Sequence, residues 1–287
     1  MGADGGGDWI HHELNLSRPD DNPDAEWEAW RAYEVASRGY PLPTWDMFSR
    51  LRPDVVKRWL VEQQRIHDVE GGFWTTLTFL HYYAVVGFEV GAGYTLDIIN
   101  RAGHALADVT DTLAVAFLNS PSMGMNAMAP ALSERLARWD EPAQPFAWPD
   151  GWDTDYARLR CGADFSSPRA TPEDLAAIRR WYLDVTGEVP RAVEFLAEHH
   201  PDVLKALRGR LETALRSMPV QMLPYLLIGL EASRMAPDAL RDALLLGRGL
   251  GLTKRQAIAA AMPSLFYSSL GGISVLDRVG ADLLADW

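Results

Sequence analysis

The sequence contains a single cysteine, Cys161, among its 287 residues. One cysteine excludes an intramolecular disulfide, a Cys-x-x-Cys redox pair and a zinc site built from cysteines. Such sparing use of cysteine is typical of a protein in a reducing compartment, and we expect a cytoplasmic location.

Basic residues and long hydrophobic runs are also scarce. The chain has 27 Lys and Arg against 39 Asp and Glu, a formal net charge of −12, which argues against a nucleic-acid partner. The stretch 256–276 has no formal charge, but a proline, several Ser and Tyr residues and a Gly-Gly pair interrupt it, so we predict no membrane association. Residues 1–23 lack the basic and apolar regions of a secretion signal and are expected to form an N-terminal arm.

Several functional motifs are missing as well. There is no glycine-rich nucleotide loop, no HExxH and no GxSxG. Neither histidine pair, at 11–12 or at 199–200, has a third residue at metal-ligand spacing, so we expect neither a metal nor another cofactor. Runs of period-two alternation are also absent, which predicts an all-α fold.

What the sequence does contain is an internal repeat. Residues 24–139 align with residues 172–287 at a constant offset (172 − 24 = 148) and without a gap. Apolar positions agree more widely than identities, as expected of two copies of one fold. The identities include Arg31/Arg179, Gly39/Gly187, Pro53/Pro201, Lys57/Lys205, Gly103/Gly251 and Gly124/Gly272, and the copies end in LARW and LADW.

Both copies carry helix signals. Thr171 and Pro172 are typical of a helix start, and Gly187 of its end. Thr253 and Gln256 have the spacing of a capping box. We therefore predict an arm (1–23), a first helical repeat (24–139), a linker (140–171) and a second helical repeat (172–287).

The order of these signals resembles the carboxymuconolactone decarboxylase and alkylhydroperoxidase AhpD-like family. The likeness covers both repeats, and it is carried by GEVPRAVEFLAEHHPDVLKAL, GYPLPTWDMFSRLRPDVVKRW, NRAGHALADV and RGLGLTKRQAI. The resemblance implies two tandem AhpD-like helical bundles packed as a pseudo-dimer. It also implies a homo-oligomer, a dimer or trimer of this chain.

The reactive positions of the family's peroxidases, a glutamate, two cysteines and a histidine, are replaced in both copies. The replacements are Thr76, Phe88, Gly91 and Thr95 in the first copy and Pro224, Ala236, Ala239 and Ala243 in the second. A thiol peroxidase needs a nucleophilic and a resolving cysteine, so that activity is excluded. The chemistry of the decarboxylases, which needs no cysteine, stays open.

The candidate site lies on the apolar stretch 73–90 and the residues that follow it. A carboxylate held among such groups should have its pKa raised by desolvation, which suits an acid or base near neutral pH. We therefore expect acid-base catalysis by Glu89, His81 and Tyr83. The expected substrate-binding residues are Trp74, Thr76, Thr78, Phe79, Tyr82, Phe88, Tyr94 and Thr95.

Each assignment has a structural alternative. His81 can be a core histidine bonded to a carbonyl, and Glu89 can reach solvent or pair with Arg101. The tyrosines can be packing residues with satisfied hydroxyls.

The leading hypothesis is a cofactor-independent lyase or isomerase of decarboxylase, isomerase or cyclase type. Its substrate would be a small, largely apolar organic acid, lactone or polyketide-like metabolite. The rival is a non-catalytic duplicated bundle that binds a hydrophobic ligand or a partner protein. A third possibility is catalysis in the second copy through Glu231, Tyr225 and Tyr267.

Overall fold

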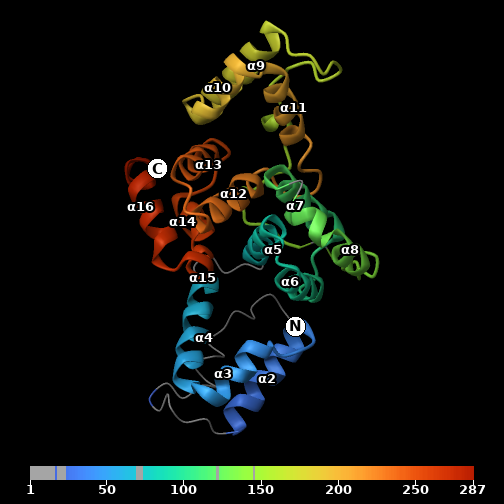
Figure 1. Ribbon diagram of the computed structural model, residues 1–287, viewed down its shortest axis with the longest axis vertical. Helices are drawn as coiled ribbons and strands as arrows, with labels where there is room; N and C mark the ends of the chain where they lie inside the picture. The colour runs from blue at the N-terminus through green and yellow to red at the C-terminus, as the bar shows by residue number, and fades with distance from the viewer. Residues whose placement is uncertain (1–16, 18–23, 69–73, 121–122, 145) are drawn as a thin grey trace.

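The fold is all-α over the residues that the computed structural model describes, which are 17, 24–68, 74–120, 123–144 and 146–287. These residues form helices and connecting turns without a strand, as the sequence predicts (Figure 1). Apart from Ser17, the predicted arm lies outside the described residues. None of the described helices is both long enough and apolar enough to cross a membrane.

The front half, 24–139, and the back half, 172–287, each contain a run of helices. The front half has α2 (Asp24–Arg38), α3 (Pro43–Leu51), α4 (Pro53–Asp68), α5 (Trp74–Val86), α6 (Glu89–Arg101), α7 (Leu106–Asn119) and α8 (Gly124–Leu136). The back half has α9 (Pro172–Thr186), α10 (Arg191–His199), α11 (Pro201–Glu212), α12 (Met222–Ser233), α13 (Pro237–Gly249), α14 (Lys254–Ala261), α15 (Ser264–Ser268) and α16 (Leu270–Ala285). A 3₁₀ turn, η1 (Tyr156–Leu159), lies between the halves.

Three of the back-half helices have the bounds of front-half helices shifted by the same 148 residues. They are α9, α10 and α13, which correspond to α2, α3 and α6. The counterpart of α7 is divided into α14 and α15 at Pro263, which stands where the front half has Val115. A proline in a helix interior removes a backbone donor and favours such a break. The domain division and the pseudo-dimer packing stay predictions.

The two halves also close in the same way. The indole Nε1 of Trp139 donates a hydrogen bond to the carbonyl of His104 at 3.0 Å, and Trp287 donates to the carbonyl of Leu252 at 2.8 Å. Each acceptor follows a glycine with positive φ, Gly103 or Gly251. The last tryptophan of each half therefore fixes the turn between two of its helices.

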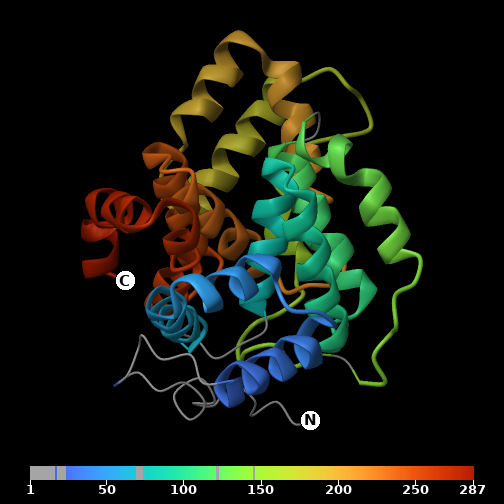
Figure 2. The same ribbon diagram turned by 60° about the horizontal axis from the view of Figure 1, so that its bottom comes forward.

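Along the long axis of the molecule, a group of three helices lies at each end and the other helices lie between these groups (Figure 1). Figures 1 and 2 show α2, α3 and α4 at one end, α9, α10 and α11 at the other, and the remaining helices between them. In the middle, α5 packs against α12. A Cβ on Gly229 would clash with the methyl group of Thr78, so glycine allows this close approach. Leu77 and Leu80 are fully buried near the crossing.

The linker, 140–171, lies on the core. The ring of Phe146 stacks on His104 at 4.1 Å, and Trp152 meets Tyr225 edge-on at 6.0 Å. The backbone N–H of Asp153 donates to the side chain of Gln221 at 3.1 Å. These contacts hold the aromatic side chains of the linker out of water.

A buried carboxylate joins the two halves. One oxygen of Asp111, on α7, accepts hydrogen bonds from three consecutive backbone N–H groups, those of Arg216, Ser217 and Met218, at 2.8, 2.7 and 2.9 Å. The neighbouring Asp108 accepts from the Ser217 hydroxyl at 2.6 Å. The connection between α11 and α12 is therefore held by acceptors from the front half.

We predict that Asp111→Ala lowers the free energy of unfolding by roughly 3 kcal/mol, because it leaves three backbone donors without their acceptor. Urea denaturation followed by circular dichroism measures the loss. Asp97→Ala is the matched control: Asp97 forms a partly exposed ion pair with Arg135 at 3.7 Å, for which a change below about 1 kcal/mol is expected. Equal losses in the two variants would contradict the role given to Asp111.

His104 is a second buried polar residue, but unlike Asp111 its side chain forms no hydrogen bond to a described residue. Both ring nitrogens are buried without a hydrogen-bond partner, and burial lowers the pKa of His104 to about 4. Leu252 occupies the equivalent place in the back half. An imidazole is therefore not needed to build this turn.

We predict that His104→Leu stabilises the protein, by about 1–2 kcal/mol at pH 7, because it removes unpaired buried polar atoms. Between the ordinary histidine pKa of 6.5 and about 4, the unfolded chain binds a proton that the folded chain does not. Wild-type stability therefore falls as pH falls through this window, and the advantage of leucine grows by up to about 1.4 kcal/mol per pH unit. The urea midpoints of the wild type and of His104→Leu at pH 7 and pH 5 measure this difference in stability. A variant less stable than the wild type at both pH values would refute the prediction.

Candidate functional site

Four tyrosines from both halves form one cluster beside the crossing of α5 and α12. Tyr82 and Tyr83 come from α5, Tyr94 from α6 and Tyr267 from α15, and we call these four the tyrosine cluster. Tyr82 and Tyr267 are stacked, with ring centroids 3.9 Å apart and planes 21° apart. Tyr83 meets Tyr94 and Tyr267 edge-on at 5.8 and 5.6 Å.

The hydroxyl groups of the cluster converge. Those of Tyr83 and Tyr94 are 2.6 Å apart and share a hydrogen bond. The Tyr267 hydroxyl is buried and makes no hydrogen bond to a described residue. A side-chain interaction of hydrogen-bond type with Tyr83 helps to raise the pKa of Tyr267, although no acceptor of a described residue lies within full hydrogen-bond distance and angle of the Tyr267 hydroxyl. The cluster therefore holds one buried O–H group without an acceptor.

The hydroxyls of Tyr82 and Tyr267 are neutral near pH 7. Burial, followed by the neighbouring phenol of Tyr83, raises the pKa of Tyr267 well above its usual value. Burial is also the first cause of the raised pKa of Tyr82. Neutral phenols with raised pKa values donate hydrogen bonds and do not act as bases.

Aromatic rings extend the cluster on the side of α4 and α15. Phe266 lies 5.4 Å from Phe79 and 6.1 Å from Trp59, measured between ring centroids. Phe79 also meets Tyr267 edge-on at 6.1 Å. The walls of the site are therefore apolar rings from three helices, α4, α5 and α15.

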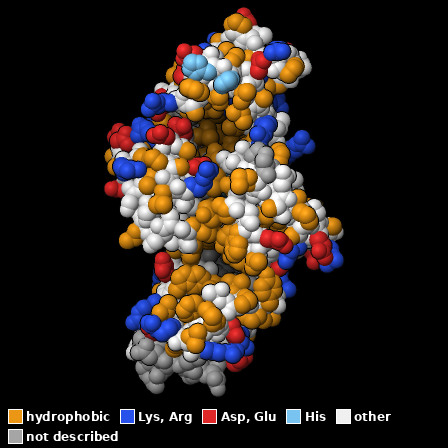
Figure 3. Space-filling model, in the orientation of Figure 1, with side chains coloured by type: hydrophobic (Ala, Val, Ile, Leu, Met, Phe, Trp, Pro, Cys, Tyr) orange, Lys and Arg blue, Asp and Glu red, His pale blue; other side chains and the backbone are white. Residues whose placement is uncertain are grey.

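The cluster is open to solvent on one side. Tyr82 and Tyr94 are half-buried, and Phe88, whose ring lies 5.3 Å from that of Tyr83, is 46% exposed. Figure 3 shows hydrophobic side chains gathered on this face of the molecule, around the region where α4, α6 and α15 meet.

His81 lies outside the cluster. It is fully buried between α5, α7 and α12, with Nε2 3.4 Å from the side-chain nitrogen of Asn119. Burial lowers the pKa of His81 to about 3, and the carbonyls of Leu226 and Val115 oppose that shift. The imidazole is neutral and enclosed, which matches the alternative of a core histidine.

Glu89 does not have the environment expected for it. It is exposed to solvent in the first turn of α6, so the desolvation that motivated its choice as an acid or base is absent. The helix begins here because Phe88 ends the turn after α5, and this leaves the carboxylate on the surface. Glu89 is next to Phe88 in the sequence, and no contact among the described residues joins its carboxylate to the tyrosine cluster.

The other predicted binding residues are divided. Thr76, Thr78 and Thr95 are buried in the helix packing, and Thr78 Oγ1 has no hydrogen-bond partner among the described residues. The side chain of Trp74 lies outside the described residues. Tyr267 was proposed only for a site in the second copy, and its contact with Tyr82 joins residues that no sequence spacing relates.

The back half offers one further carboxylate. Glu231 is 7% exposed on α12, and its carboxylate lies 3.7 Å from the guanidinium of Arg234. Burial raises the pKa of Glu231, and Arg234 opposes that shift. Tyr225, proposed with it, is fully buried on the same helix and faces Trp152. Among the described residues, no ring contact or hydrogen bond joins Glu231 to the tyrosine cluster.

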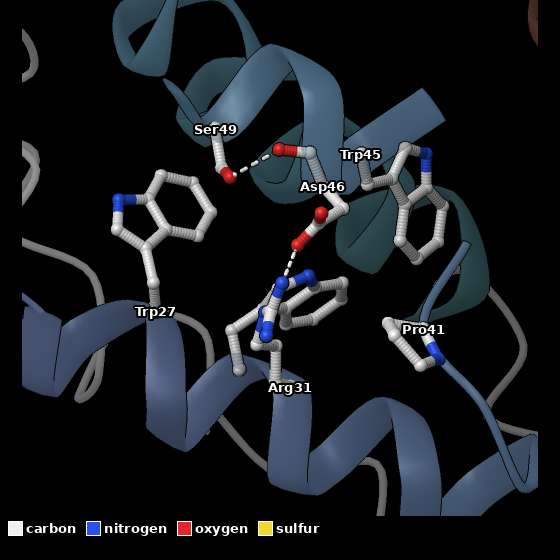
Figure 4. Close-up of a pocket in the computed structure, with 7 residues that line it drawn as sticks. Trp27, Arg31, Pro41, Trp45, Asp46 and Ser49 are labelled. Atoms are coloured by element: carbon white, nitrogen blue, oxygen red, sulfur yellow. Dashed lines mark hydrogen bonds and ion pairs between the residues drawn. The ribbon is translucent and has the colours of Figure 1, made fainter. Parts of the chain in front are cut away.

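A separate hollow lies between α2 and α3, lined by three tryptophans (Figure 4). The cavity volume is only about 10 Å³, which is room for one water molecule. An ion pair between Arg31 and Asp46 crosses it, and the back half has the same pair as Arg179 and Glu194 at 2.8 Å. This hollow is therefore a packing defect beside a repeated ion pair, too small for an organic ligand.

The sequence could have pointed to this hollow. Trp27, Trp30 and Trp45 stand where the back half has Leu175, Ile178 and Val193. Three indoles therefore line the front-half hollow where the back half has aliphatic side chains.

Comparison with protein-family models, with curated proteins and with solved structures gives no match to this chain.

Proposed function

We propose that the chain binds a small, largely apolar organic molecule on the open side of the tyrosine cluster. The observation that supports it is the buried Tyr267 hydroxyl without a partner inside a wall of aromatic rings. Ligand sites combine apolar walls with a few placed polar groups in this way. An unpaired buried hydroxyl lowers stability, and a ligand oxygen would offset that loss.

Phe88→Ala tests this proposal, because Phe88 covers the rim of the cluster and is partly exposed. We expect the dissociation constant for an apolar aromatic probe, 2-acetylnaphthalene, to rise by about tenfold, the effect of losing roughly 1.4 kcal/mol of apolar contact. Ligand-observed NMR titration measures it.

Phe195→Ala is the matched control for this experiment. Phe195 is an exposed phenylalanine on α10, 58% accessible and remote from the cluster. It should leave the affinity unchanged. Equal weakening in both variants, or no saturable binding by the wild type, would count against the site.

A second candidate is turnover of the bound molecule without a cofactor, as a decarboxylase, isomerase or cyclase. Its support is the exposed carboxylate of Glu89, next to Phe88 in the sequence, together with the phenol donors of the tyrosine cluster. The carboxylate would take a proton from a carbon next to a carbonyl, and the Tyr83 hydroxyl would donate to the oxygen that gains electron density. His81 has no part in this candidate, because it is enclosed elsewhere.

Exchange in D₂O tests this second candidate. The enzyme should accelerate replacement of the methyl protons of 2-acetylnaphthalene by deuterium, and Glu89→Gln and Tyr83→Phe should each slow exchange by about tenfold or more, as expected for lost acid-base catalysis. Helicity should stay unchanged. Asp97→Asn, another carboxylate change on α6, serves as the control. If exchange with the protein is no faster than in buffer, the turnover candidate is wrong, and the proposal of a binding protein is unaffected.

We also infer a place in the carboxymuconolactone decarboxylase and AhpD-like family, with the two halves packed as a pseudo-dimer. The equal helix bounds at an offset of 148 support it. Assembly into a homo-oligomer belongs to the same proposal, supported by exposed apolar side chains at equivalent positions of the two halves. These are Val35/Leu183, Met47/Phe195 and Val55/Val203. A cytoplasmic location, supported by the lone cysteine, completes it.

A further inference from the structure

The chemistry of the tyrosine cluster restricts which apolar molecules it can hold. The Tyr267 hydroxyl is a donor with no acceptor among the described residues, so a ligand needs an oxygen at this point. The rings around it are apolar, with Tyr82 stacked on one face and Phe79 and Tyr83 at its edges, so a molecule whose oxygen met this hydroxyl would place its body against aromatic rings.

The elements around this donor carry little charge. Helix α5, which supplies Phe79, Tyr82 and Tyr83, has no Asp, Glu, Lys or Arg, and neither has α15, which supplies Tyr267. The imidazole of His81 on α5 faces α7 and α12 instead. On α6, Glu89 is exposed to solvent, while Asp97 pairs with Arg135. Arg234 is the cation that acts on Tyr82, more weakly than burial does.

A negative charge is therefore disfavoured at this place. Burial and the neighbouring phenols act against ionisation of Tyr267 itself. The same environment acts against a carboxylate placed against its hydroxyl, because a buried charge needs a counter-charge to offset its lost hydration. A carbonyl oxygen carries only a partial charge and can accept the hydrogen bond without that loss.

We propose that the tyrosine cluster selects neutral carbonyl compounds, whose oxygen accepts a hydrogen bond from Tyr267, over the corresponding carboxylates. The proposal rests on the proposed binding of a small apolar molecule at this site, and it specifies the class of that molecule. Within the classes considered from the sequence, it favours a lactone or polyketide-like ketone over an organic acid.

Three probes of one shape test the selection: 2-acetylnaphthalene, 2-naphthoate and 2-ethylnaphthalene. The ketone supplies an acceptor without charge, the acid an acceptor with charge, and the hydrocarbon neither. Ligand-observed NMR titration at pH 7 should give the ketone an affinity at least about tenfold above that of the acid, the range in which an unmatched buried polar or charged group acts on binding. The ketone should also exceed the hydrocarbon severalfold.

Tyr267→Phe isolates the hydrogen bond. In this variant the ketone should lose its advantage over the hydrocarbon, while the hydrocarbon binds as it does to wild type. Tyr182→Phe is the matched control, since Tyr182 is a part-buried phenol on α9, away from the cluster. It should leave all three affinities unchanged.

The outcomes separate the two proposals. Failure of all three probes to bind the wild type would overturn the binding site itself. Binding of the acid as tightly as the ketone would overturn the selection and leave the site. A ketone preference that survives Tyr267→Phe would overturn the role of the Tyr267 hydroxyl.

Discussion

The close approach of α5 and α12 governs the architecture of this protein. Gly229 lets the two helices meet at Thr78, and each helix is apolar almost all round, so each must be covered on nearly every side. The other helices of both halves supply that cover. One result is that α15, from the back half, lies against α5 and delivers Tyr267 to Tyr82. The tyrosine cluster is thus a by-product of how the central helices are enclosed.

The interior also explains why histidines behave so differently from tyrosines here. His81 and His104 are enclosed, and each loses its charge to burial. The tyrosines of the cluster pack their rings at the edge of the core, where the Tyr83 and Tyr94 hydroxyls bond each other and the Tyr267 hydroxyl is buried.

Much of the fold could be predicted from the sequence, because its signals are local or periodic. The offset between the halves, the cap at Thr171 and the glycine at 187 all act over a few residues, and the helices begin and end accordingly. Where Pro263 interrupts the back half, a single residue accounts for the broken helix. Local rules suffice for such features.

The site was harder to predict, because it depends on contacts between distant segments. Tyr82, Tyr83 and Tyr94 could be named from their stretch of sequence, and the structure brings them together. The fourth member, Tyr267, comes from the other half, and no spacing relates it to them. Glu89 failed as a buried carboxylate for the same reason: whether a residue at the end of an apolar run is buried depends on the turn that follows and on what covers it.

The stacked pair of Tyr82 and Tyr267 has a consequence for the history of the chain. Its two rings belong to different halves, and the equivalent positions, Leu230 and Asn119, cannot form such a stack. A symmetric assembly of identical subunits would have to carry the same residue at both places. The two halves of one polypeptide are free to differ, and the stack of Tyr82 on Tyr267 depends on that difference.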